Sequence, residues 1–150
     1  MKNLRNRARV CWILTGLRVV DEKGVERLRG IDLQVRAGEI VGVAGVAGNG
    51  QSELLEVLGG YQTGKGSVRV KGQALDLTGK HSDGQSRRNH GIAHVPEDRQ
   101  REGLIMDYQA WENTAFGYHK DPAYRSGILM NNAAIKADTV DKMERYGVRP

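Results

Sequence analysis

The sequence predicts an α/β fold in which a parallel strand–loop–helix unit carries an attached antiparallel sheet. Three observations predict this fold class. An apolar run, a glycine-rich turn and a helical pattern follow one another within residues 40–58. Alternating apolar and polar residues on both sides of that unit predict further strands. Helical patterns gather toward the C-terminal end, so helices and strands are mixed along the chain.

The composition is that of an ordinary globular domain. The chain has 150 residues, of which 39% are hydrophobic and 27% charged, and this length is enough for one modest domain with a core. The one cysteine, Cys11, excludes an intrachain disulfide framework and fits a reducing compartment. The longest apolar run is about half the roughly 20 residues that a membrane-spanning helix needs, so none is predicted.

The net charge of +5 allows two interpretations, a nucleic-acid-binding surface and a solvated basic surface. The basic residues are scattered in short clusters, and no aromatic residues interleave with them to form a stacking platform. We therefore favour the solvated surface. The basic residues 1–9 are predicted to be a ragged end that leads into a strand, because the apolar stretch after them is too short for a secretory signal.

Three strands are predicted before the glycine-rich turn. Residues 10–20 are rich in Val, Ile and Trp, and residues 21–24 form a turn. Residues 28–36 alternate apolar and polar side chains and are predicted to pair with the first strand. The third strand, residues 40–44, is apolar on both faces, which is typical of the centre of a covered parallel sheet.

A short helix and an alternating strand are predicted after the turn. The helix covers residues 51–58 and ends at the glycines 59–60. The strand covers residues 66–71. Three leucines of the helix are expected to face inward: Leu54, Leu55 and Leu58.

The C-terminal third is predicted to be mainly helical. Residues 92–95 form a short strand that stops at a proline, and residues 109–118 form a helix. The last helix begins at a cap on Asn131 or Asn132 and ends at Gly147. Four apolar side chains share one stripe of that helix: Ala133, Ala137, Val140 and Met143.

The glycine-rich turn has the spacing of a phosphate-binding loop. Gly45 and Gly50 are five residues apart and Ser52 follows two later, as in the pattern G-x-x-x-x-G-K-[ST], but Gln51 stands in the lysine position. Glycines let backbone N–H groups close around phosphate oxygens, and the following helix adds free N–H groups and the positive end of its dipole. Ser52 has the position of the hydroxyl that ligates Mg²⁺ in such loops.

The loop pattern alone leaves one alternative open, a glycine-rich strand-to-helix turn that binds nothing. A dinucleotide-binding fingerprint is excluded, because its third glycine would fall at Glu53. The four histidines have no metal-ligand spacing and no paired nucleophile, so solvent-facing or core positions are expected for all of them. They are His81, His90, His94 and His119.

Four stretches, taken in order, carry a resemblance to a known family. They are residues 36–42 before the loop, residues 45–55, residues 64–68, and residues 91–99 with the following Gly103-Leu104 and Trp111-Glu112-Asn113. With these stretches the chain resembles an ATP-binding-cassette (ABC) ATPase domain. More narrowly, it is similar to the second cassette of the double-cassette subunits that energise bacterial importers of simple sugars and nucleosides. The resemblance covers residues 28 to about 118.

The resemblance implies a P-loop NTPase core with an attached antiparallel β subdomain and the start of a helical subdomain. In the partial nucleotide-binding domain that it implies, residues 1–9 are the ragged N-terminus, residues 10–118 the P-loop core and β subdomain, and residues 119–150 the start of the helical subdomain. It implies ATP and Mg²⁺ as cofactors. The implied nucleotide-binding residues are Gly45, Val46, Ala47, Gly48, Asn49, Gly50, Gln51, Ser52 and Glu53.

The implied metal ligands are Ser52 and Glu97. Glu97 stands where many ABC domains have a glutamine that touches Mg²⁺ and the attacking water. A carboxylate can ligate such a hard cation. The alternative is a solvated acid beside Arg99.

The resemblance also implies a function for the whole protein. That protein couples MgATP binding and hydrolysis to the import of a simple sugar or nucleoside, and it is cytoplasmic, peripheral on the inner face of the cell membrane. The implied partners are transporter membrane subunits and a second ABC cassette, either intrachain in a full-length protein or in a dimer. Nucleic acid is not an expected partner.

Three departures from the family limit the expected activity. Gln51 keeps a hydrogen-bond donor but loses the lysine charge, which is expected to weaken nucleotide binding roughly ten-fold. No aromatic residue near residues 21–23 stacks on adenine. The signature loop and the strand ending in Asp-Glu are expected beyond residue 150, and residues 104–107 match that strand poorly. The isolated chain is therefore expected to bind nucleotide weakly, with no catalytic residue and no turnover.

Two other functions stay open at the level of sequence. The first is a non-catalytic coupling module, in which residues 97–147 dock the membrane subunit and the loop is only scaffold. The second is a nucleic-acid binder, which the net charge suggests but no recognition motif supports.

Overall fold

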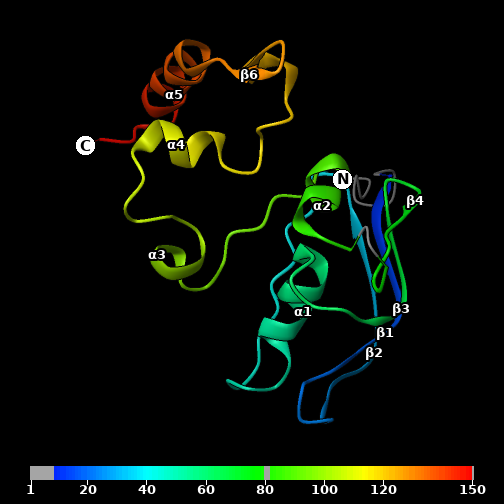
Figure 1. Ribbon diagram of the computed structural model, residues 1–150. Helices are drawn as coiled ribbons and strands as arrows, with labels where there is room; N and C mark the ends of the chain where they lie inside the picture. Colours follow the sequence, from blue (N-terminus) through cyan, green and yellow to red (C-terminus); the bar gives the residue numbers. More distant parts are fainter. Residues whose placement is uncertain (1–8, 80–81, 150) are drawn as a thin grey trace, which may run out of the picture. The chain divides into compact units, whose positions relative to one another are not determined.

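The computed structural model describes residues 9–79 and 82–149, and these form two compact units. The first, here called the N-terminal unit, ends at His94, and the second, the C-terminal unit, begins at Val95 (Figure 1). The predicted ragged end lies almost wholly outside the described residues. The subdomain boundary between residues 118 and 119 stays a prediction about the family's subdivision.

The N-terminal unit is built on one antiparallel sheet. Its strands are β1 (Val10–Val20), β2 (Glu26–Arg36), β3 (Lys65–Val70) and β4 (Gln73–Ala74), in the spatial order β2-β1-β3-β4 (Figure 1). The register places Leu14 of β1 opposite Leu33 of β2 and Val68 of β3. The predicted alternation in β2 and β3 is confirmed, because their apolar side chains share the face that carries the core.

One helix, α1 (Gln51–Gly59), packs against this sheet. It ends as predicted, with Gly60 in the left-handed conformation at φ +83°. The predicted inward face is right for Leu54, which is buried, and wrong for Leu55, which is 51% exposed. Val57 is fully buried instead, because the sheet meets α1 over the stripe that contains positions 54 and 57.

The core of the N-terminal unit joins the sheet, α1 and the segment after β4. Its buried members are Leu14, Leu17, Val19, Leu28, Leu54, Val57, Val68, Val70, Leu75 and Leu77. Six of these ten lie on β1, β2 and β3, so the sheet is the platform against which the helix packs.

The predicted strand at residues 40–44 is wrong for this structure. None of these residues belongs to a strand, and Ile40 is 97% and Val43 59% exposed. A strand persists only where a neighbour pairs its N–H and C=O groups. The described sheet gives this segment no such neighbour. The predicted strand at residues 92–95 is absent for the same reason, although Ile92 packs against the core.

A second helix, α2 (Gly84–Asn89), closes the N-terminal unit. Asp83 caps it by accepting a hydrogen bond from the N–H of Ser86 at 2.8 Å. Its side chain Arg87 is only 1% exposed and donates hydrogen bonds to the carbonyls of Val57, Leu58 and Asp76. The arginine therefore fixes α2 to the C-terminal end of α1.

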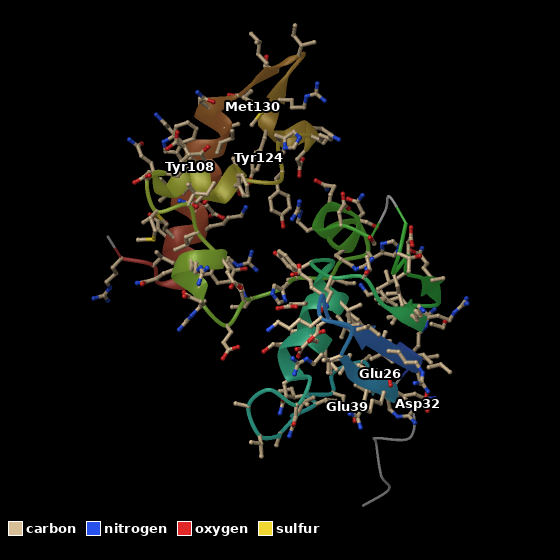
Figure 2. All side chains as sticks on the ribbon, turned by 60° about the horizontal axis from the view of Figure 1, so that its bottom comes forward. Glu26, Asp32, Glu39, Tyr108, Tyr124 and Met130 are labelled. Atoms are coloured by element: carbon tan, nitrogen blue, oxygen red, sulfur yellow. The ribbon has the colours of Figure 1, made fainter. Side chains whose placement is uncertain are left out.

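The C-terminal unit is mainly helical (Figure 2). Its elements are α3 (Arg99–Glu102), α4 (Ala110–Ala115), the 3₁₀ turn η2 (Pro122–Tyr124), β5 (Arg125–Ser126), β6 (Leu129–Met130) and α5 (Asn132–Tyr146). Its core consists of Ala115, Tyr124 and Ile135, with Trp111 packed against them. The predicted helix at residues 109–118 is confirmed but shorter, because Gln109 forms its cap with Glu112.

The first and last residues of α5 agree with the prediction, whereas the predicted buried face is wrong. Asn131 accepts a hydrogen bond from the N–H of Ala134 at 3.1 Å, and Gly147 ends the helix at φ +66°. The buried side chains are Ile135 and Thr139. None of the four stripe residues is buried: Ala133, Ala137 and Val140 are exposed, Val140 at 56%, and Met143 is half-buried. No helix in the described part of the chain combines the length and apolar character needed to cross a membrane.

Candidate functional site

The glycine-rich loop turns tightly just before α1. Gly48 and Gly50 have φ values of +85° and +96°, which side chains with a Cβ adopt only with strain. The N–H of Asn49 donates to the carbonyl of Val46 at 3.2 Å and closes the turn. The predicted glycine turn that leads into a helix is therefore present, whereas the predicted strand before it is absent.

Gly50 seats the start of α1 on the sheet. A Cβ atom at Gly50 would lie 2.7 Å from the backbone oxygen of Arg27 and 2.8 Å from Cδ2 of Leu28, both on β2. Only glycine allows this approach. The end of the loop and the first turn of the helix are thus held in place by β2.

The first turn of α1 presents backbone donors. The first hydrogen bond within the helix runs from the N–H of Leu54 to the carbonyl of Gly50, at 2.9 Å. The N–H groups of Gln51 and Glu53 therefore have no acceptor inside the helix, and no side chain caps them. Together with the positive end of the helix dipole, this end of α1 fits a phosphate group.

Ser52 is exposed in this first turn, where the loop pattern requires a hydroxyl. A serine hydroxyl at a phosphate site suits Mg²⁺, which takes few protein ligands and completes its shell with phosphate oxygens and water. The residues of the loop therefore fit the nucleotide and the metal that the sequence implies.

Gln51 folds back onto its own loop. Its Nε2 donates a hydrogen bond to the carbonyl of Val46 at 3.3 Å. A Cβ atom on Gly45 would overlap this amide nitrogen, so the missing side chain of Gly45 provides the space that Gln51 occupies. The missing side chain of Gly45 therefore permits the folded-back position of the Gln51 amide.

A charged cluster lies between β2 and the first turn of α1. Nε of Arg27 is 2.8 Å from Oδ2 of Asp21 and 3.8 Å from Oε1 of Glu53. Hydrogen bonds from the N–H of Val25 and from the Arg27 guanidinium hold the pKa of Asp21 below its usual range. Sequence reasoning missed Arg27, because an arginine on an alternating strand carries no signal of such a role.

The second candidate metal ligand, Glu97, is exposed in the C-terminal unit, whereas Ser52 belongs to the N-terminal unit. Their joint binding of one metal ion therefore stays a prediction. Among the described residues, no group of three or more His, Cys, Asp and Glu side chains could hold a metal ion. His81 lies outside the described residues.

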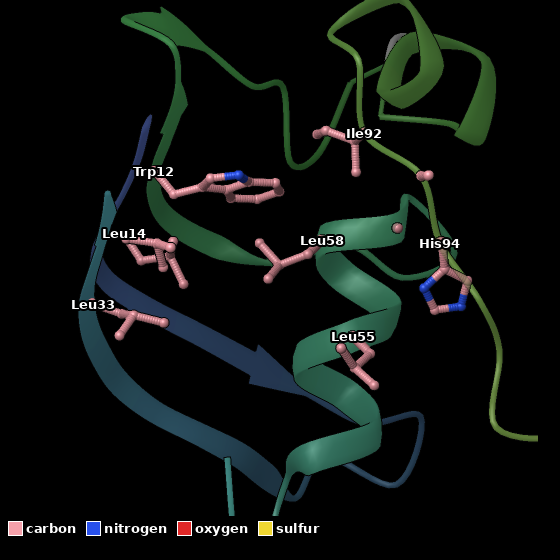
Figure 3. Close-up of a pocket in the computed structure, with 10 residues that line it drawn as sticks. Trp12, Leu14, Leu33, Leu55, Leu58, Ile92 and His94 are labelled. Carbon is pink, nitrogen blue, oxygen red and sulfur yellow. The ribbon is translucent and has the colours of Figure 1, made fainter. Parts of the chain in front are cut away.

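An apolar pocket of about 260 Å³ lies between α1 and the sheet (Figure 3). Trp12 of β1 and Leu58 of α1 point into it, and the His94 ring, which contacts Tyr61 at a centroid distance of 5.0 Å, lies at its rim. Its lining is otherwise almost entirely aliphatic. Such a surface does not orient a phosphate, so the anion-binding features belong to the glycine-rich loop.

Comparison with known proteins gives concordant results. The family model described as ABC transporter matches residues 28–148. The guanosine import ATP-binding protein NupO of Bacillus subtilis is 39% identical over 125 residues, which are 82% of this chain and 24% of that protein. The ribose import ATP-binding protein RbsA of Pseudomonas putida is 42% identical, over 89% of this chain and 26% of its own length.

An archaeal relative has a similar match. The glucose import ATP-binding protein TsgD13 of Haloferax volcanii is 37% identical over 130 residues, which are 86% of this chain and 23% of that protein. The chain thus spans about a quarter of the length of the curated relatives that it matches.

Proposed function

The chain belongs to the ABC transporter family, and on that premise we propose that it is part of the ATP-binding subunit of an importer for simple sugars or nucleosides. The relatives support the solute class, since their names refer to guanosine, glucose and ribose import. The single observation that carries the nucleotide assignment is the loop that leads into α1. Its glycines, its turn and the uncapped first turn of α1 together suit a polyphosphate.

In this proposal the backbone of residues 45–53 binds and orients the phosphates. The N–H groups of the first helical turn donate to phosphate oxygens, and Gly50 keeps these donors fixed against β2. Ser52 would hold Mg²⁺, and Glu97 is also proposed as a metal ligand. Bound Mg²⁺ would neutralise charge on the phosphates. Hydrolysis also requires an aspartate that holds the metal and a group that positions water. No residue of the proposed site is assigned either role, so we expect the chain to bind nucleotide without turnover.

The partners and location follow the same proposal. Residues 10–118 form the P-loop core and β subdomain, and residues 119–150 begin the helical subdomain of the nucleotide-binding domain. Transporter membrane subunits and a second ABC cassette complete the working assembly. We place it at the cytoplasmic side of the membrane, because ATP is supplied there to an importer.

The test is a titration of the chain with MgATP, followed through the amide resonances of the loop. We expect the amides of residues 48–52 to shift in a saturable way, and the Ser52→Ala variant to bind more weakly because it lacks the hydroxyl for Mg²⁺. A second assay measures ATP hydrolysis. Steady turnover above that of the Ser52→Ala variant would contradict the proposal of binding without turnover.

A coupling module that docks a membrane subunit is the second candidate, and one observation favours it. The hairpin formed by β5 and β6 carries apolar side chains in solvent, with Ile128 92% and Leu129 69% exposed. In this function the glycine-rich loop is only scaffold. Loop amides that stay unmoved at saturating MgATP would favour this module over the nucleotide-binding function.

A further inference from the structure

Gln51 occupies the position at which loops of this pattern have a lysine that reaches the β- and γ-phosphates. In the structure its side-chain amide instead donates to the carbonyl of Val46 at 3.3 Å, within the loop. The side chain is neutral, and one N–H of its amide is already engaged within the loop. It therefore brings no positive charge to a third phosphate, and its recorded hydrogen bond directs the amide to the loop instead.

The position of this side chain is built into the loop. Gly50, at φ +96° and pressed against the backbone of Arg27, fixes where α1 begins and hence where residue 51 leaves the backbone. Gly45 leaves open the space into which the amide of Gln51 folds. Both glycines thus favour the inward position of the Gln51 side chain.

The neighbouring cation does not replace the missing charge. Arg27 is held by Asp21 at 2.8 Å and by Glu53 at 3.8 Å, and these two carboxylates outweigh its single positive charge. Glu53 lies in the first turn of α1, beside the proposed phosphate site. A ligand with one more negative charge therefore gains nothing from this cluster.

We propose that Gln51 makes the loop insensitive to the third phosphate, so that the chain binds MgADP about as tightly as MgATP. The inference rests on the proposed function. The backbone N–H groups of such loops act on the α- and β-phosphates, which both nucleotides possess, whereas the lysine is the loop group that reaches the γ-phosphate. The site then responds to the total concentration of nucleotide di- and triphosphates rather than to the ratio between them.

The test compares dissociation constants for MgATP and MgADP, measured from the shifts of the loop amides. For the natural chain and for Gln51→Ala, we expect the two constants to agree within about three-fold, since neither side chain carries charge to the γ-phosphate. For Gln51→Lys, we expect the preference for MgATP to rise about ten-fold, because the lysine ammonium adds a positively charged donor that reaches the γ-phosphate. Gln51→Ala is the matched control, because it removes the amide without adding charge.

The outcomes separate the two proposals. Binding of MgATP about ten-fold tighter than MgADP by the natural chain would overturn this inference and leave the proposed function standing. An unchanged ratio in a folded Gln51→Lys chain would also overturn it. If neither nucleotide moves the loop amides, the proposed function fails and the inference fails with it. Should Gln51→Lys not fold, the ratios for the natural chain and Gln51→Ala decide the question.

Discussion

A Cβ atom on Gly50 would lie 2.7 Å from the backbone oxygen of Arg27, so the first residue before α1 rests directly on β2. Two separate constraints favour glycine at position 50. Its φ of +96° disfavours other residues, and its contact with β2 excludes a side chain. The geometry of the candidate phosphate site therefore depends on the packing of α1 against the sheet.

This relationship predicts graded effects for three glycine-to-alanine variants. Gly50→Ala adds both strain and overlap, whereas Gly48→Ala, at φ +85° with no atom within 4 Å of the added Cβ, adds strain alone. Gly42→Ala adds neither. We expect Gly48→Ala to lower the free energy of unfolding by roughly 1–2 kcal/mol and Gly50→Ala by about 1–3 kcal/mol more.

Urea unfolding of the three variants measures these differences. Gly42→Ala is expected to stay close to the natural chain. Equal losses for Gly48→Ala and Gly50→Ala would show that the contact with β2 contributes nothing to stability.

Local patterns predict much of this structure, because each depends on neighbours in sequence. The alternation in β2, the glycine that ends α1 at Gly60 and the cap at Asn131 are all decided within a few residues. The spacing of the loop glycines belongs to the same class, since the turn they form is local.

The errors concern features that depend on distant residues. The run at residues 40–44 has a strand composition, but its state depends on partner strands that the described sheet does not supply. The inward face of α1 depends on which side meets the sheet, which decides between Leu55 and Val57. The buried role of Arg87 was missed, because a charged residue in a polar stretch gives no sign of burial.

Arg87 is predicted to be the most important charged side chain for the stability of the N-terminal unit. It donates to the carbonyls of Asp76 at 2.9 Å, Leu58 at 3.1 Å and Val57 at 3.4 Å. Its positive charge at the C-terminal end of α1 also complements the helix dipole. Burial lowers the pKa of Arg87, and the nearby Asp76 and Asp83 partly offset this effect.

Arg87→Met is expected to lower the free energy of unfolding by about 2–4 kcal/mol, because it leaves buried carbonyls without donors. Arg29→Met is the matched control, since Arg29 lies exposed on β2. Urea unfolding compares the two. A loss for Arg87→Met no larger than for Arg29→Met would refute the assigned role.

The C-terminal unit contains a cluster whose stability should depend on pH. The hydroxyl of Tyr124 donates to Asp138, and Nζ of Lys142 lies 2.7 Å from Oδ2 of Asp138 and 3.0 Å from the Tyr124 hydroxyl. Hydrogen bonds from Lys142 and Tyr124 lower the pKa of Asp138. The hydrogen bond that Lys142 donates to Asp138 raises the pKa of Lys142. Burial, followed by the bond to Asp138, raises the pKa of Tyr124.

The signs of these shifts define a stability plateau. Asp138 stabilises the fold above the ordinary aspartate pKa of about 4, and this contribution is lost as the pH falls through its lower folded value. Tyr124 and Lys142 stabilise it below ordinary pKa values of about 10, and their contribution is lost as the pH rises through the higher folded values. The melting temperature of the C-terminal unit is therefore expected to fall on both sides of this range.

Thermal melts across pH test the cluster in the Lys142→Met variant. We expect a lower plateau and a weaker fall on the acidic side, because Asp138 loses the partner that depresses its pKa. Lys120→Met, which removes an equal charge from an exposed position, is the control. A pH profile of Lys142→Met that matches the profile of Lys120→Met would exclude the cluster as the cause.

Base recognition by the proposed nucleotide site is predicted to be weak. The turn between β1 and β2 has no aromatic side chain at residues 21–24, and Asp21 is engaged with Lys23, Val25 and Arg27. Loss of a stacking partner removes roughly 1–3 kcal/mol of base-specific affinity. We expect MgGTP to bind within about three-fold of MgATP in a competition titration. A clear preference for adenine would reveal a stacking residue elsewhere in the chain.

The account depends most on backbone N–H groups that bind a polyphosphate without the usual cation. The most direct measurement adds magnesium tripolyphosphate, which has no base or sugar, and follows the amide resonances of residues 45–53. We predict saturable shifts confined to this loop and the first turn of α1, and their loss in Gly50→Ala. Unchanged loop amides in the natural chain, or shifts spread over basic surface residues instead, would contradict the assignment of this loop as a phosphate site.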